Sequence, residues 1–237
     1  MMSGKRWGYV VQFFCLLVFF GMSPFLIKMD GRKTRSVSSD SVRSQNVSDE
    51  VKPVVALTFD DGPNASSTPI LLDGLKERKV RATFFLIGEN VEKDENEKIV
   101  KRMYEEGHLI GNHTYTHCNL SKLETGEAKK ELEQTDTVIE KITGKQPVFV
   151  RAPYGELPVD SEQDLNRIYI GWTVDPLDWM TEDTGAVVKT VVEEINPGDV
   201  ILLHDCYKSS VEAALRIVDL LKAEGFEFVT VDKLILE

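Results

Sequence analysis

From Val54 onward, short apolar runs alternate with amphipathic helical stretches, and this alternation limits the folds that the chain can adopt. The apolar runs that we interpret as strands cover 54–57, 83–87, 109–110, 148–150, 168–173, 200–203 and 228–231. The stretches with helical features cover 66–75, 92–106, 125–143, 184–194 and 211–224. This order predicts an α/β domain with a parallel sheet, either open or closed into a barrel.

Polar clusters follow five of the strand-like runs. On a parallel sheet these clusters would gather at one end, where the active sites of α/β proteins lie. The first cluster is Asp60-Asp61, followed at once by the turn residues Gly62-Pro63. A plain surface turn is the alternative, because Asp, Gly and Pro are common turn residues. Adjacent strand residues point to opposite sides, so the two acids need not share a role.

A histidine pair suggests what one of these acids does. His113 and His117 stand four residues apart, and they are two of only four histidines in the chain. That spacing can place both imidazoles on one side of a helix or a tight loop, although the pair alone is a weak signal. Either Asp60 or Asp61 can supply the third ligand. Two histidines and one carboxylate, with a position open for water, form a hydrolytic metal site.

Hydrolysis also needs a base for the water and an acid for the leaving group. The aspartate that does not bind the metal is free to be the base, and His204 suits the acid because its pKa lies near neutrality. Arg151 and Asp178 follow other strand-like runs and can tune these groups through charge pairs. Structural ion pairs are the alternative interpretation of both residues.

Composition excludes some other functions. The chain has 237 residues and a net charge of −11, and residues 51–237 alone hold 21 Lys/Arg against 35 Asp/Glu. So acidic a domain is unsuited to nucleic acid, whose phosphates require basic patches. Three cysteines without CxxC spacing form neither a disulfide framework nor a zinc ribbon.

The amino-terminal part differs from the rest. Residues 1–28 contain a basic start and an apolar stretch from Trp7 to Ile27, which is long enough to cross a bilayer. We expect an uncleaved membrane-anchor helix, with a cleaved signal peptide as the alternative. Residues 29–52 are polar and nearly lack large apolar groups, so we expect a disordered stalk that links the anchor to a domain at 53–237.

Five motifs occur along the chain in this order: Thr58–Pro63, His113–His117, Arg151–Gly155, Asp175–Trp179 and Leu202–Asp205. They resemble the motifs of polysaccharide deacetylases with the NodB homology domain, carbohydrate esterase family 4. The resemblance covers nearly all of residues 54–234 and implies an irregular (β/α) barrel of the polysaccharide deacetylase type.

The resemblance also implies roles on one side of the site. Asp60 would be the general base, and Arg151 would orient it. Asp61, His113 and His117 would bind a divalent metal ion, with Zn²⁺ as the expected ion and Co²⁺ or Ni²⁺ as alternatives.

Further roles are implied on the other side. His204 would be the general acid, paired with Asp178. The backbone N–H of Tyr154 would hold the tetrahedral oxyanion. Trp179 and Leu202 would form the walls of a pocket for the acetyl methyl group.

The function implied is metal-dependent hydrolysis of N-acetyl groups on a β-1,4-linked amino-sugar polymer, releasing acetate. Together with an anchor and a stalk, this suggests a monomeric enzyme on the outside of the cell membrane that acts on peptidoglycan N-acetylglucosamine. Chitin oligomers and acetyl-xylan are alternative substrates. A catalytically inactive cell-wall binding protein is the alternative of another class.

The chain departs from the family pattern at two positions. Ala152 replaces a proline in the third motif, and Cys118 follows the second histidine where proline is common. Because Cys206 follows His204 by two residues, the resemblance places both thiols near the metal. We expect two buried free thiols. A disulfide that joins two active-site loops is the alternative hypothesis.

Overall fold

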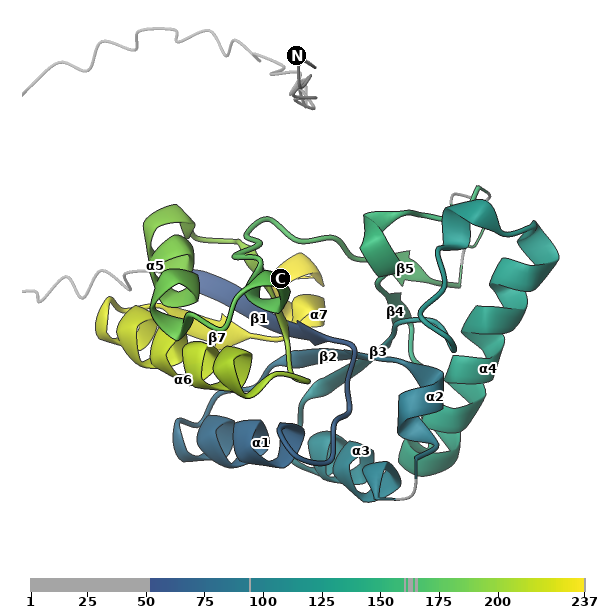
Figure 1. Cartoon of the computed structure of the whole chain (residues 1–237), viewed down its shortest axis with the longest axis horizontal. Coiled ribbons are helices and arrows are strands. Elements are labelled where there is room, and N and C mark those ends of the chain that lie inside the picture. Colours follow the sequence, from purple (N-terminus) through teal and green to yellow (C-terminus); the bar gives the residue numbers. More distant parts are fainter. Residues whose placement is uncertain (1–51, 94, 160, 162–163, 165, 237) are drawn as a thin grey trace, which may run out of the picture. The chain divides into compact units, whose positions relative to one another are not determined.

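A computed structural model describes residues 52–93, 95–159, 161, 164 and 166–236, and its strands form one parallel sheet (Figure 1). The order across the sheet is β5-β4-β3-β2-β1-β6, and β7 pairs with the first half of β1. The strands are β1 (Val54–Asp60), β2 (Thr83–Leu86), β3 (Leu109–Asn112), β4 (Phe149–Val150), β5 (Ile168–Tyr169), β6 (Val200–His204) and β7 (Glu227–Val229).

Helices lie around the outside of this sheet (Figure 1). The helices are α1 (Thr68–Glu77), α2 (Gly88–Val91), α3 (Asn96–Glu105), α4 (Thr125–Thr143), α5 (Thr184–Glu194), α6 (Lys208–Ala223) and α7 (Val231–Leu236). The sequence predicts the bounds of α4 and α5 correctly. It predicts neither α2 nor α7, and it begins α3 four residues too early, at residue 92, because the charged stretch before Asn96 has the same polar character as α3.

The sheet curls into a half-barrel. Beyond β5 the chain crosses to the other end of the strand order, where the N–H groups of Thr173 and Val174 donate to Val200 O at 3.0 and 3.2 Å. Leu202 N returns a bond to Val174 O at 2.9 Å, which forms a single parallel bridge. The predicted 168–173 strand is therefore only two residues long, because the chain leaves the β4 edge to reach β6.

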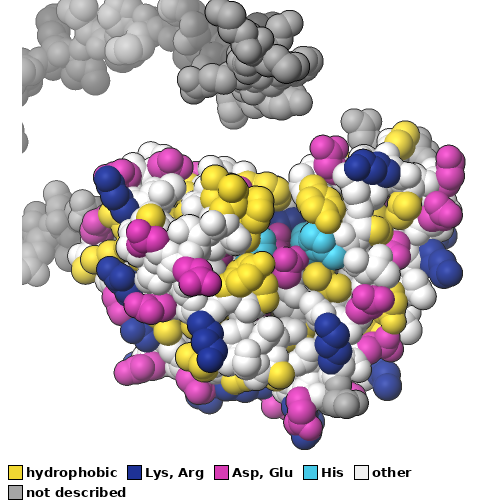
Figure 2. Space-filling view, viewed as in Figure 1, with side chains coloured by type: hydrophobic (Ala, Val, Ile, Leu, Met, Phe, Trp, Pro, Cys, Tyr) yellow, Lys and Arg dark blue, Asp and Glu magenta, His cyan; other side chains and the backbone are white. Residues whose placement is uncertain are grey.

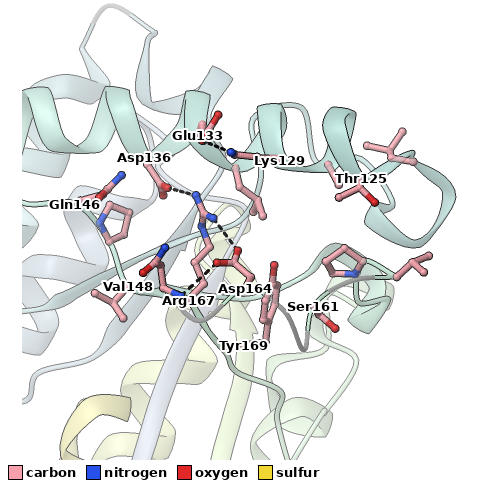
Figure 3. Close-up of a pocket in the computed structure, with 17 residues that line it drawn as sticks. Thr125, Lys129, Glu133, Asp136, Gln146, Val148, Ser161, Asp164, Arg167 and Tyr169 are labelled. Carbon is pink, nitrogen blue, oxygen red and sulfur yellow. Dashed lines mark hydrogen bonds and ion pairs between the residues drawn. The ribbon is translucent and has the colours of Figure 1, made fainter.

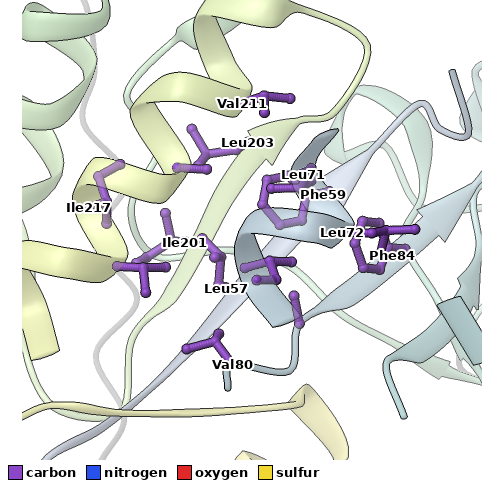
Figure 4. Close-up of a cluster of buried hydrophobic side chains, with 14 of the residues drawn as sticks. Leu57, Phe59, Leu71, Leu72, Val80, Phe84, Ile201, Leu203, Val211 and Ile217 are labelled. Atoms are coloured by element: carbon purple, nitrogen blue, oxygen red, sulfur yellow. The ribbon is translucent and has the colours of Figure 1, made fainter. Parts of the chain in front are cut away.

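The core packs on both sides of β1, whose residues from Val55 to Asp60 are all buried. Leu57 and Phe59 belong to one buried cluster with side chains of α1 and of the neighbouring strand β6 (Figure 4). The ring of Phe59 stacks on that of Phe84 in β2 with centroids 5.2 Å apart. Burial of each such side chain contributes about 1.5–3 kcal/mol, and this holds the central strand against the helices.

The anchor and stalk fall on residues that the structure does not describe. Residues 1–51 lie outside the described ranges, so the anchor at 1–28 and the linker at 29–52 stay predictions. Among the described residues, no helix is both long and apolar enough to cross a membrane.

One buried histidine makes the stability of the fold dependent on pH. His108 is only 6% exposed, and its Nδ1 accepts a hydrogen bond from Ala82 N at 3.1 Å. Its ring packs at a right angle to that of Phe84, with the ring centroids 5.2 Å apart. Burial lowers the pKa of His108 to about 4, so the folded chain keeps this imidazole neutral.

We predict that the free energy of unfolding decreases as the pH falls from about 6.5 to about 4, because His108 becomes protonated at a higher pH in the unfolded chain than in the folded chain. The His108 contribution to this loss is about 3 kcal/mol. In His108→Asn the side-chain oxygen can still accept from Ala82 N but does not titrate, so the loss should shrink by that amount. Urea unfolding at several pH values measures it. An unchanged pH dependence in the variant would contradict the prediction.

Candidate active site and metal centre

The register of the strands brings the predicted site residues together. Asp60 and His204 are direct partners across β1 and β6. Asn112 pairs with Val150, so His113 and Arg151 leave neighbouring strands at the same level. The carboxyl ends of these strands therefore place all four groups at one edge of the sheet.

Asp61, His113 and His117 form a cluster of possible metal ligands. Asp61 Oδ1 lies 3.4 Å from Nε2 of His113 and 3.2 Å from Nε2 of His117. The ligand atoms of all three residues lie within 4.8 Å of one another. Ligands about 2.0–2.1 Å from a tetrahedral ion lie roughly 3.3 Å apart, so both distances fit such an ion.

Two features of the cluster favour a cation over a hydrogen-bonded network. Asp61 Oδ1 is buried and makes no hydrogen bond. Nδ1 of His113 lies 2.7 Å from the carbonyl oxygen of Arg151, which can only accept a hydrogen bond. Nδ1 therefore holds the proton, and the lone pair of Nε2 is free to face Asp61 and His117.

The electrostatics of the cluster also favour the ligating forms. Burial alone would raise the pKa of Asp61, but the interaction with His113 and the charges of His113, His117 and His204 lower it overall. Burial lowers the pKa of His117. Metal ligands must be ionised carboxylates and neutral imidazoles, and both shifts act in that direction.

The second acid, Asp60, faces the inside of the curled sheet. It is 3% exposed, and its Oδ1 accepts a hydrogen bond from Arg151 Nη1 at 2.9 Å. Its Oδ2 lies 3.7 Å from Nε2 of His113, next to the candidate ligands. Asp60 is thus a fixed, charge-paired carboxylate beside the position where a metal-bound water would lie.

His204 and Asp178 form the second pair of the site. Nδ1 of His204 lies 2.7 Å from Asp178 Oδ1, and the backbone N–H of His204 donates to Asp178 Oδ2 at 2.8 Å. Burial opposes the charged imidazole, but the hydrogen bond and charge of Asp178, with the charges of Asp60 and Asp61, raise the pKa of His204 to about 9. His204 is therefore protonated at neutral pH, with Nε2 as its second donor.

These groups lie in a hollow between two raised, partly apolar margins (Figure 2). Leu202 is buried in β6, two residues before His204 and on the same face of the strand. The loops that follow β4, Val174 and β6 carry exposed large apolar side chains, among them Tyr154, Leu177, Trp179, Met180 and Tyr207.

Backbone strain concentrates in these loops. Among the described residues, six other than glycine have positive φ, and five of them lie in the motif loops. Each such conformation costs on the order of 1–3 kcal/mol and is typical of functional sites. The five are Asp61, Thr114, His117, Tyr154 and Leu177.

Sequence reasoning overlooked Thr58 and Asp205, although both lie in the motifs. Thr58 Oγ1 accepts from Arg151 Nη1 at 2.7 Å and donates to Ile201 O at 2.7 Å. Asp205 is fully buried, and its Oδ2 accepts from Thr68 Oγ1 at 2.6 Å. Thr58 thus connects β1 to β6, the strand that ends at His204. Asp205 connects the loop after β6 to the start of α1.

The structure contains Cys118 and Cys206 as free thiols, each half-buried. The disulfide hypothesis is therefore not supported. Both thiols are less buried than expected.

A hollow of about 620 Å³ lies away from these groups, between α4 and the chain on either side of β5 (Figure 3). Arg167 lies in it and pairs with Asp136 and Asp164 at 2.7 Å each. None of the predicted site residues lines it. Its charged side chains are paired with one another.

A cluster of possible metal ligands, a buried carboxylate and a protonated imidazole thus lie at one sheet edge, and metal-dependent hydrolysis requires groups of these kinds. The family model for polysaccharide deacetylase matches residues 48–170. The peptidoglycan-N-acetylglucosamine deacetylase of Bacillus cereus is 42% identical over 186 residues, which are 76% of this chain and 67% of that protein. The chain belongs to the polysaccharide deacetylase family, whose members are hydrolases.

A second relative is the peptidoglycan-N-acetylmuramic acid deacetylase PdaC of Bacillus subtilis, which is 38% identical over 82% of this chain. The chain spans 41% of the length of PdaC. The solved structure of PdaC superimposes with a TM-score of 0.74 at 38% identity, over 78% of this chain and 90% of that one.

A third similar protein is a family 4 acetyl xylan esterase from Clostridium thermocellum, solved in complex with a cobalt ion. Its TM-score is 0.73 at 33% identity, over 77% of this chain and 90% of that one. The curled parallel half-barrel described above is therefore the fold of this family.

Proposed function

We propose that the protein is a metal-dependent deacetylase that hydrolyses the N-acetyl group of N-acetylglucosamine in peptidoglycan and releases acetate. The observation on which this depends most is the separation of the two acids. Asp61 lies against two histidines, whereas its neighbour Asp60 pairs with a buried arginine. The substrate is proposed because the Bacillus cereus relative is named for it.

Asp61, His113 and His117 would hold the metal ion, and the free Oδ1 of Asp61 and the two Nε2 atoms suit Zn²⁺. Co²⁺ or Ni²⁺ would fit the same nitrogen and oxygen ligands. When bound, such an ion polarises a carbonyl group and lowers the pKa of a bound water.

Asp60 would accept the proton of the attacking water. Arg151 holds Oδ1 of Asp60 at 2.9 Å, so this oxygen is fixed and Oδ2 faces the ligand side. A base held rigidly in a buried setting needs little reorganisation as the proton arrives.

His204 would donate its proton to the departing nitrogen of the sugar. Asp178 takes the hydrogen bond of Nδ1, which leaves Nε2 for the substrate. The same carboxylate also fixes the backbone of His204, so ring and main chain are oriented together. Proton donation of this kind contributes typically about 10²–10⁴-fold to the rate.

The acetyl group would be held by residues around this centre. Tyr154 has φ of 61°, and we propose its backbone N–H as a donor to the oxyanion. Leu202, on the same face of β6 as His204, and Trp179, directly after Asp178, would enclose the methyl group.

Two other substrates and one function of another class are the alternatives to this proposal. Acetyl-xylan is one alternative substrate, since one structural relative is an acetyl xylan esterase. Chitin oligomers are the other alternative substrate. A cell-wall binding protein without activity is the alternative of another class. The enzyme is supported over this alternative because the three proposed ligands, the proposed base Asp60 and the proposed acid His204 are all present.

We also propose that the domain acts outside the cell as a monomer anchored in the membrane by residues 1–28, because this segment contains an apolar stretch from Trp7 to Ile27 that follows Lys5 and Arg6. Protease treatment of intact cells should remove a tag on the carboxyl terminus. Light scattering of residues 50–237 should give the mass of one chain. Protection of the tag would contradict the location outside the cell, and the mass of a dimer would contradict the monomeric state.

The function predicts acetate release from peptidoglycan by the soluble part, residues 50–237, with added Zn²⁺ or Co²⁺. A chelator should abolish acetate release, because it removes the metal ion from Asp61, His113 and His117. Adding the metal ion back should restore acetate release. A panel of peptidoglycan, chitin oligomers and acetyl-xylan measures preference under the same conditions. Faster release from chitin or xylan would contradict the substrate, and no chelator-sensitive release from any of them would contradict the enzyme.

The function also predicts how activity depends on pH. The acid must be protonated, so activity should fall as the pH rises through the pKa of His204, about 9. Asp178→Asn keeps an acceptor oxygen but removes the charge that stabilises the imidazolium, so the alkaline fall should move toward neutral pH. Rates measured from pH 6 to 10 should show this. The exposed Glu182→Gln, with the same loss of charge, is the control and should keep the wild-type profile. Equal profiles for both variants would contradict His204 as the acid.

A further inference from the structure

The loop that presents the two histidines is strained. It follows β3 and runs from His113 to His117, and both Thr114 and His117 have positive φ, at 63° and 58°. These are sparsely populated conformations for residues with a Cβ. Other contacts must therefore hold the loop in the shape that turns both imidazoles toward Asp61.

One carboxylate from another element binds the middle of this loop. Glu131 Oε2 accepts hydrogen bonds from the backbone N–H groups of Tyr115 at 3.0 Å and Thr116 at 2.8 Å. Its Oε1 accepts from Thr116 Oγ1 at 3.1 Å. The thiol of Cys118, just after His117, also interacts with it. Bonds to an ionised acceptor are roughly twice as strong as neutral ones.

Glu131 lies on a helix whose position is itself fixed. Asn112, the last residue of β3, donates from Nδ2 to Leu132 O at 2.8 Å and to Asp136 Oδ1 at 2.6 Å. The other oxygen of Asp136 binds Arg167 at 2.7 Å, on the inner side of α4 (Figure 3). The helix is therefore attached to the end of the strand from which the histidine loop starts.

We propose that Glu131 is a positioning residue for the metal site, which sets the affinity for the ion by holding His113 and His117 in ligating geometry. The inference rests on the proposed function only in that these histidines are the ligands. Glu131 contacts the backbone between them and neither imidazole, so it takes no part in the chemical step.

The test measures Zn²⁺ affinity by competition with a chromophoric chelator for Glu131→Ala, Glu131→Gln and the control Glu133→Gln. Glu133 lies on the same helix and pairs with Lys129 at the surface (Figure 3). Glu131→Ala should weaken binding about 10–100-fold, as loss of groups that orient metal ligands does. Glu131→Gln keeps an acceptor and should lose less. Glu133→Gln should stay within about twofold of wild type.

Two further measurements separate positioning from other roles. Turnover per bound metal at saturating Zn²⁺ should equal that of wild type for each Glu131 variant. If Glu131→Ala does not fold, Glu131→Gln provides the same comparison. Wild-type affinity in a folded Glu131 variant, even with a lowered melting temperature of the metal-free protein, would overturn the positioning role. Absence of Zn²⁺ binding by wild type would instead overturn the metal site itself.

Discussion

The guanidinium of Arg151 lies inside the curled sheet, where it connects the central strand β1 to the chain beyond β5. It is 1% exposed and donates to Thr58 Oγ1 and Asp60 Oδ1 on β1 and to the carbonyl oxygens of Ile170 and Gly171 beyond β5. A buried charge is very unfavourable unless its hydrogen bonds are made, and here they join the segment that crosses toward β6 to the central strand. The same bonds fix one of the two site acids.

This arrangement gives two adjacent aspartates different environments. Asp60 is the last residue of β1 and points inward to Arg151. Asp61 leaves the strand with φ of 70° and meets the two histidines. Arg151 serves both sides, because its carbonyl oxygen fixes the proton of His113 on Nδ1. The proposed base and the proposed metal ligands are thus oriented by one buried residue.

Periodicity and motif order predicted the alternation of elements, the parallel sheet and the gathering of polar clusters at one edge. Periodicity alone could not predict the half-barrel, for which only the family resemblance of the motifs gave an expectation, because the crossing after β5 rests on one bridge at Val174 rather than on an apolar pattern. Glu131 could not be found from the sequence, since a glutamate on the polar face of a helix normally faces water. The positive φ of Thr114 and His117 is likewise imposed by contacts from other elements.

The different roles of the two acids are tested most directly by comparing Asp60→Asn with Asp61→Asn by Zn²⁺ titration and by acetate release at saturating metal. We expect Asp60→Asn to bind Zn²⁺ nearly as tightly as wild type and to lose turnover by about 10²–10⁴-fold, as for a missing general base. We expect Asp61→Asn to lose most of its Zn²⁺ affinity. Loss of the metal in Asp60→Asn with retention in Asp61→Asn would contradict the assignment of the two acids.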